Sequence, residues 1–139
     1  MLPEQELAVI SLLASYAEIN DTPVDYLRDP ENEQEYNTVV GNLEEKISLY
    51  FPELSSKELD NIFIHAFDKC NSHIGGYGAP LPKIAPEHEA LVEKGYNEYL
   101  RRKAATIEML NSGKFLGKLT SFIIGYELIN YYADIVTKI

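Results

Sequence analysis

Four side chains with metal-binding chemistry lie close together in the stretch HAFDKCNSH, namely His65, Asp68, Cys70 and His73. They combine the thiolate, imidazole and carboxylate ligands from which zinc sites are built. On a helix, however, Cys70 lies about 140° around the axis from His65, so the four side chains cannot converge unless the helix unwinds. The stretch therefore favours a buried cysteine and two surface histidines over a metal site. We expect no bound metal or other cofactor.

Residues suited to nucleophilic or acid–base catalysis are few. Cys70 and His73 have the spacing of a thiol–imidazole pair, but Cys70 falls where packing calls for a small apolar residue. Glu127 and Asp134 lie on one strip of an otherwise apolar segment. This strip is typical of a solvent-exposed face, and the alternative is a buried carboxylate paired with a nearby arginine. The pattern predicts no catalytic residues and favours a protein that is not an enzyme.

The densest charge in the chain is acidic and lies in DTPVDYLRDPENEQE, residues 21–35. Residues 1–60 hold fourteen Asp and Glu against three Lys and Arg, whereas residues 61–139 hold eight against nine. Such a field repels nucleic acids and anionic membranes and attracts basic partners. Tyr26, which we expect to be exposed in this segment, has the rigid area and hydroxyl of an interface anchor. The predicted partner-binding surface consists of Asp21, Asp25, Tyr26, Asp29, Glu31, Glu33 and Glu35.

A run of three cations, Arg101, Arg102 and Lys103, is the feature that could suggest nucleic-acid binding. Glu98 precedes Arg102 by four residues, and the whole chain carries a net charge of −10. Both facts favour a solvated helix face, so we expect no direct contact with nucleic acid.

The spacing of apolar residues predicts an all-α fold, a single-domain bundle of about five helices. The expected helices cover about 4–20, 31–50, 55–70, 86–110 and 114–137, with a short helical turn between Pro23 and Pro30. Ser55 and Glu58 have capping-box spacing at the start of the third helix. The stripe expected to be buried on the fourth helix includes Leu100 and Ile107.

The last predicted helix, 114–137, carries two apolar stripes and so is apolar over most of its circumference. Such a helix is central to its bundle or is covered by a second subunit. We predict a central C-terminal helix, and a homodimer formed through it is the alternative. The glycine- and proline-rich segment 72–86 before the fourth helix is expected to be a semi-rigid connector.

Composition and charge together indicate a non-enzymatic binding or inhibitor protein. One cysteine, no long apolar run and no basic N-terminal region predict a soluble, cytoplasmic chain. Its acidic half, 1–60, is expected to engage a basic protein such as a nuclease toxin or a nucleic-acid-binding protein, as an immunity protein, antitoxin or DNA mimic does. Two alternatives stay open: an oligomeric structural protein, and a small-molecule-binding enzyme with a pocket lined by His73, Tyr77, His88 and Glu127.

Overall fold

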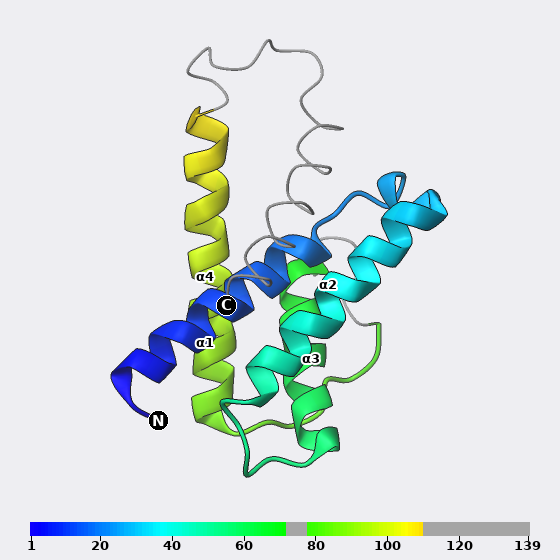
Figure 1. Cartoon of the computed structure of the whole chain (residues 1–139). Helices are drawn as coiled ribbons and strands as arrows, with labels where there is room; N and C mark the ends of the chain where they lie inside the picture. The colour runs from blue at the N-terminus through cyan, green and yellow to red at the C-terminus, as the bar shows by residue number, and fades with distance from the viewer. Residues whose placement is uncertain (72–77, 110–139) are drawn as a thin grey trace.

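The computed structural model describes residues 1–71 and 78–109, which form an all-α single domain (Figure 1). Within these residues there are four α-helices, one 3-10 turn and no strand. The elements in chain order are α1 (Pro3–Asn20), η1 (Tyr26–Arg28), α2 (Pro30–Ser48), α3 (Ser56–Asn71) and α4 (Pro86–Met109). The predicted fold class and the short turn between the two prolines are thus confirmed. The expected helix 114–137 lies outside the described residues, and its predicted central position stays a prediction.

The helices begin where local chemistry satisfies their free backbone amides. Asp29 caps α2 by accepting a hydrogen bond from the Glu31 backbone N–H at 2.9 Å, and Pro30 takes the first helical position. At the start of α3, the Ser55 N–H donates to Glu58 Oε1 at 3.1 Å, while the Glu58 N–H donates to Ser55 Oγ at 3.2 Å. The capping box predicted from the sequence is therefore present.

Among the described elements, α1 is the central helix, because it packs against α2, α3 and α4 (Figure 1). Every residue from Leu12 to Ile19 is buried, including Ser15 and Glu18, so α1 is covered around its whole circumference over two turns. Most of the buried apolar side chains form one cluster around it. Its members are Val9, Leu12, Leu13, Tyr16, Ile19, Tyr26, Val39, Leu43, Ile47, Phe51, Ile62, Phe63, Ala66 and Val92.

The contact between α1 and α4 is close because α4 has a glycine where the two helices cross. A Cβ atom on Gly95 would lie 2.5 Å from the Cβ of Leu13. Beside this contact, Lys94 Nζ lies 2.6 Å from Glu6 Oε1. The crossing brings the sequence-distant ends of the described chain together and positions the polar groups considered below.

The last turns of α4 project beyond α1 (Figure 1). Leu100 and Ile107, which the sequence pattern placed in a buried stripe, are 42% and 47% exposed, so that prediction is wrong for these two residues. Tyr99, Arg102 and Lys103 contact α1 or Asp21, which follows it, so α4 still lies against α1 at the level of Leu100, and Leu100 is exposed because it lies on another side of the helix. Ile107 lies in the last turns of α4, beyond these contacts. None of the described helices is long and apolar enough to cross a membrane.

Candidate functional site

The predicted acidic segment lies at one corner of the molecule, where η1 leads into α2 (Figure 1). All six of its carboxylates are exposed. We call five of them, Asp25, Asp29, Glu31, Glu33 and Glu35, the acidic surface. Arg28 lies 3.2 Å from Asp25, but both side chains are more than three-quarters exposed, so water and salt screen this pair strongly. In the part of the chain that the structure describes, Glu31, Glu33 and Glu35 have no ion pair.

Asp21, the first residue of the predicted set, is used by the fold. It follows the end of α1, and its carboxylate accepts a hydrogen bond from the Tyr99 hydroxyl of α4. Lys103 Nζ approaches the same carboxylate at 3.2 Å. Burial and this hydrogen bond to a carboxylate raise the pKa of Tyr99, so the hydroxyl keeps its proton. Asp21 therefore fastens α4 to α1 and contributes little free charge to the acidic surface.

Tyr26 is not the exposed anchor that the sequence suggested, because its side chain is 5% exposed and belongs to the main core cluster. The 3-10 turn explains the difference. The backbone N–H groups of Tyr26 and Leu27 donate to the Pro23 and Val24 carbonyls, which turns this stretch back toward the core. Asn32 Nδ2 then donates to the Tyr26 carbonyl at 3.0 Å and fixes the turn against α2. The sequence feature that could have predicted the burial of Tyr26 is the short apolar pair Tyr26-Leu27 within an otherwise polar segment.

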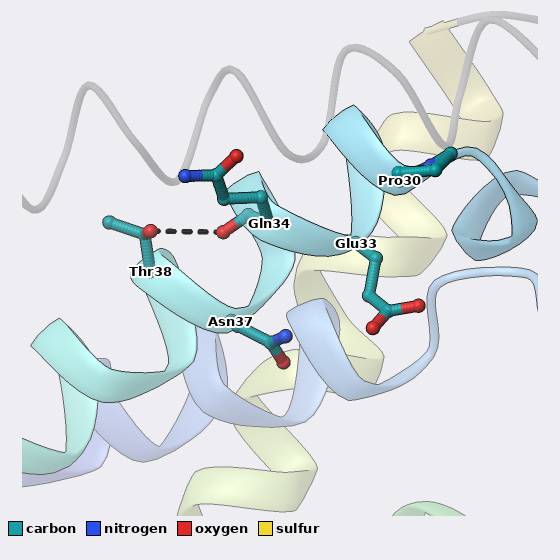
Figure 2. Close-up of a pocket in the computed structure, with 5 residues that line it drawn as sticks. All are labelled: Pro30, Glu33, Gln34, Asn37 and Thr38. Atoms are coloured by element: carbon teal, nitrogen blue, oxygen red, sulfur yellow. Dashed lines mark hydrogen bonds between the residues drawn. The ribbon is translucent and has the colours of Figure 1, made fainter.

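A hollow of about 570 Å³ lies on α2 and includes Glu33 of the acidic surface; Figure 2 draws the residues that line it. Its lining is polar apart from Pro30 and comprises Pro30, Glu33, Gln34, Asn37 and Thr38. Glu33 and Asn37, one helical turn apart, point to the same side of α2 (Figure 2). Thr38 Oγ1 donates to the Gln34 carbonyl at 2.9 Å, which leaves the hydroxyl oxygen able to accept. This hollow offers carboxylate, amide and hydroxyl oxygens to a hydrogen-bond donor on a partner.

Of the four residues proposed to line a small-molecule pocket, His88 is the one that lies in the described part of the chain. His88 lies in a hollow of about 650 Å³ formed by the start of α1, residues 49–53 and the start of α4. Its ring packs edge-on against Phe51 with the ring centroids 5.3 Å apart. His73, Tyr77 and Glu127 lie outside the described residues. The charged groups Lys94 and Glu6 in this hollow already pair with each other.

In the described part of α3, the cysteine and histidine side chains have structural roles. Cys70 is buried, its Sγ donates to the Ala66 carbonyl at 3.3 Å, and burial raises the pKa of the thiol to about 12. A protonated, buried thiol is a poor nucleophile. His65 Nε2 lies 2.5 Å from the Pro82 carbonyl and so fastens the connector to α3. Over residues 1–71 and 78–109, no group of three potential ligands could hold a metal ion.

The sequence pattern did not predict a polar cluster of Glu18, Glu98 and Arg102 between α1 and α4, in which Glu18 is the buried member. Glu18 is 5% exposed, and burial raises the pKa of its carboxyl to about 8, although the positive charge of Arg102 partly opposes this shift. Arg102 donates to Ser11 Oγ at 2.8 Å and to Ser15 Oγ at 3.3 Å, and it lies 3.4 Å from Glu98.

The prediction that the basic run 101–103 lies on a solvated helix face is therefore confirmed for Arg101, which is exposed and donates a hydrogen bond to Glu98. It is wrong for Arg102, which is half-buried against α1. The polar strip Ser11, Ser15 and Glu18, spaced four and three residues apart on an apolar helix, was the signal that could have revealed this contact. Glu127 and Asp134, the other candidate buried carboxylates, lie outside the described residues.

Comparison with protein-family models, with curated proteins and with solved structures found no match. The functional argument therefore rests on the geometry and charge of this chain.

Proposed function

We propose that this chain is a non-enzymatic binding protein that engages a basic protein surface through its acidic surface. The observation that carries the proposal is the exposure of Asp25, Asp29, Glu31, Glu33 and Glu35 on one turn and the first part of one helix. Arg28 is the single cation in residues 21–35. Asp21 and Tyr26 have structural roles and are not part of the proposed contact.

The distribution of charge supports a directed attraction. The first 60 residues carry fourteen acids and three cations, so the negative potential is concentrated on one half of the chain. A negative field of this kind steers a cationic partner toward the acidic surface and speeds the encounter. Lys94 and Lys103 of α4 pair with Glu6 and Asp21, two of these fourteen acids, and Arg101 pairs with Glu98 on α4 itself, so none of these three cations pairs with a residue of the acidic surface.

The chemistry of the acidic surface matches that of an inhibitor of a nucleic-acid-binding protein. Carboxylates accept the same charge-assisted hydrogen bonds from Arg and Lys that phosphate oxygens accept. A helix bearing exposed carboxylates can therefore occupy a cationic site built for a nucleic-acid backbone. On this proposal the chain acts as an immunity protein, an antitoxin or a DNA mimic, and its partner is a basic toxin or nucleic-acid-binding protein.

The test compares two sets of charge reversals with the same change in net charge. Glu31→Lys, Glu33→Lys and Glu35→Lys are combined in one variant of the full chain, and Glu4→Lys, Glu53→Lys and Glu89→Lys in a second. The sets are matched, because Glu31, Glu33, Glu4 and Glu89 all lie in first helical turns, where a reversal costs similar helix-dipole energy. Binding to an immobilised oligo-arginine peptide is measured at low and at physiological salt.

We expect wild-type affinity to fall steeply with salt, and the first variant to lose most of its binding while the second keeps most of it. Equal losses in the two variants would mean that net charge alone drives the binding. Affinity that does not change with salt would remove the electrostatic basis of the proposal.

A further inference from the structure

A second hollow, of about 400 Å³, lies where α1, α2 and α3 meet. Its volume falls in the range of small ligand sites, which begins at about 300 Å³. One lining residue comes from α1, one from α2 and four from α3. They are Tyr16, Glu44, Asp60, Phe63, Ile64 and Phe67.

The wall of this hollow is largely aromatic. Tyr16 and Phe63 are buried and pack with their ring centroids 5.5 Å apart, at an angle of 38°. Phe67, one turn further along α3, is 37% exposed, an unusual position for a phenylalanine in a soluble helix. Aromatic faces attract organic cations through the negative potential above the ring. The wall therefore suits the flat or alkyl part of a cationic group.

Two carboxylates from different helices, Glu44 of α2 and Asp60 of α3, line the same hollow. Burial raises the pKa of Glu44, and the negative charge of Asp60 raises it further. Glu44 in turn contributes to the raised pKa of the Tyr16 hydroxyl, after the larger effect of burial. Across the described ranges, neither Glu44 nor Asp60 has a hydrogen bond or an ion pair through its side chain. Two like charges held this way repel each other, and a cation placed between them would relieve the repulsion.

We propose that this hollow binds the guanidinium group of an arginine side chain on the basic partner. This assignment rests on the proposed function, because the arginine would come from the basic partner proposed above. A planar guanidinium can stack on Phe67, the exposed aromatic ring of the wall, while its N–H groups bond Glu44 and Asp60. A metal ion fits less well, because a hard cation needs six or more oxygen ligands and the hollow supplies two carboxylates.

The position of Glu44 links this hollow to the acidic surface. Glu33 and Glu44 are eleven residues apart on α2, which places them within about 20° of each other around the helix axis and about 16 Å apart along it. A partner lying along this side of α2 would therefore contact Glu33 and reach the hollow with one side chain, whereas Glu31 and Glu35 lie on the other side of the helix, about 160° around the axis from Glu33.

The test uses a probe with a single guanidinium group. The ¹⁵N-labelled full chain is titrated with Nα-acetyl-arginine N-methylamide, and separately with the citrulline counterpart, which has the same shape without the charge. We expect saturable amide shifts centred on Asp60, Phe63, Ile64 and Phe67 with the arginine compound, and none with citrulline. In a Glu44→Gln, Asp60→Asn variant, the affinity for the arginine compound should fall about tenfold.

Three results would overturn the assignment: no saturable shift at these residues, equal shifts with citrulline, or unchanged affinity in the double variant. The double variant removes a repulsion between like charges, so it should remain folded, and its thermal melt checks this. The variant with Glu31→Lys, Glu33→Lys and Glu35→Lys should bind the arginine compound as the wild type does. If that variant binds the arginine compound and also keeps its oligo-arginine binding, the hollow is supported and the acidic surface is rejected. If the variant loses oligo-arginine binding and the chain does not bind the arginine compound, the acidic surface is supported and the hollow is rejected.

Discussion

Gly95 of α4 lies directly against Leu13 of α1, so close that a Cβ on the glycine would stand 2.5 Å from the leucine Cβ. The next nearest atoms are backbone atoms of Leu13 and Ala14, at 3.4 and 3.6 Å, so no flexible side-chain end can move aside. The absence of a side chain at Gly95 therefore sets the distance between these two helices. The same approach allows Arg102, two turns along α4, to reach Ser11 and Ser15.

We predict that Gly95→Ala destabilises the protein by about 1–3 kcal/mol, because the helices must separate to admit the methyl group. Gly41 in α2 provides the matched control, since a Cβ there would meet no atom within 4 Å. Gly41→Ala should stabilise the fold by about 0.5–1 kcal/mol through helix propensity. Chemical denaturation measures both changes, and a stabilising Gly95→Ala would contradict the close packing described here.

Glu18 should make the stability of the protein depend on pH. Its pKa is raised from 4.5 to about 8 by burial, so the folded state holds this proton more tightly than the unfolded state. The stability gained from this proton is full below pH 4.5 and is lost as the pH rises to about 8, with a slope of up to about 1.4 kcal/mol per pH unit. In Glu18→Gln, stability should fall less over this window than in the wild type.

The measurement is the free energy of unfolding of both proteins at several pH values between 4.5 and 8. Glu53→Gln serves as the control, because Glu53 is exposed in the segment between α2 and α3. Parallel profiles for wild type and Glu18→Gln would show that the carboxyl is not held in its protonated form.

The capping box of α3 should contribute measurable stability. Ser55→Ala removes the hydroxyl that accepts from the Glu58 N–H, and we expect a loss of about 1 kcal/mol. Ser56, the next residue and the first of α3, gives the control, because its exposed side chain has no such role in the structure. Similar losses from Ser55→Ala and Ser56→Ala in thermal unfolding would argue against the cap.

Cys70 should be unreactive in the native protein. Burial raises the pKa of its thiol to about 12, so little thiolate forms at pH 8, and the sulfur is shielded from reagents. A chromogenic thiol reagent should react slowly with the native chain and fast in denaturant. A chain carrying Ser56→Cys and Cys70→Ala should react fast in both conditions, and rapid labelling of native Cys70 would contradict its position in the core.

The helices and their caps could be predicted from the sequence because they depend on residues close together in the chain. The periodicity of α1, α2 and α3, the Ser55–Glu58 box, and the small apolar position of Cys70 are all of this kind. Six of the seven predicted site residues are exposed as expected, since acids in turns and at the ends of helices seldom have reason to be buried.

The remaining features depend on contacts between distant parts of the chain. Tyr26 is buried because the 3-10 turn places it against the core, Asp21 is engaged because Tyr99 and Lys103 reach it from α4, and Arg102 is covered by α1. Local pattern carries no information about which helix lies opposite a given side chain. Thus the sequence by itself determined the all-α class, the helix limits and the location of the negative charge. The tertiary structure decided which of those acids are engaged by the fold and which are not, because only packing between helices fixes the contacts of each charge.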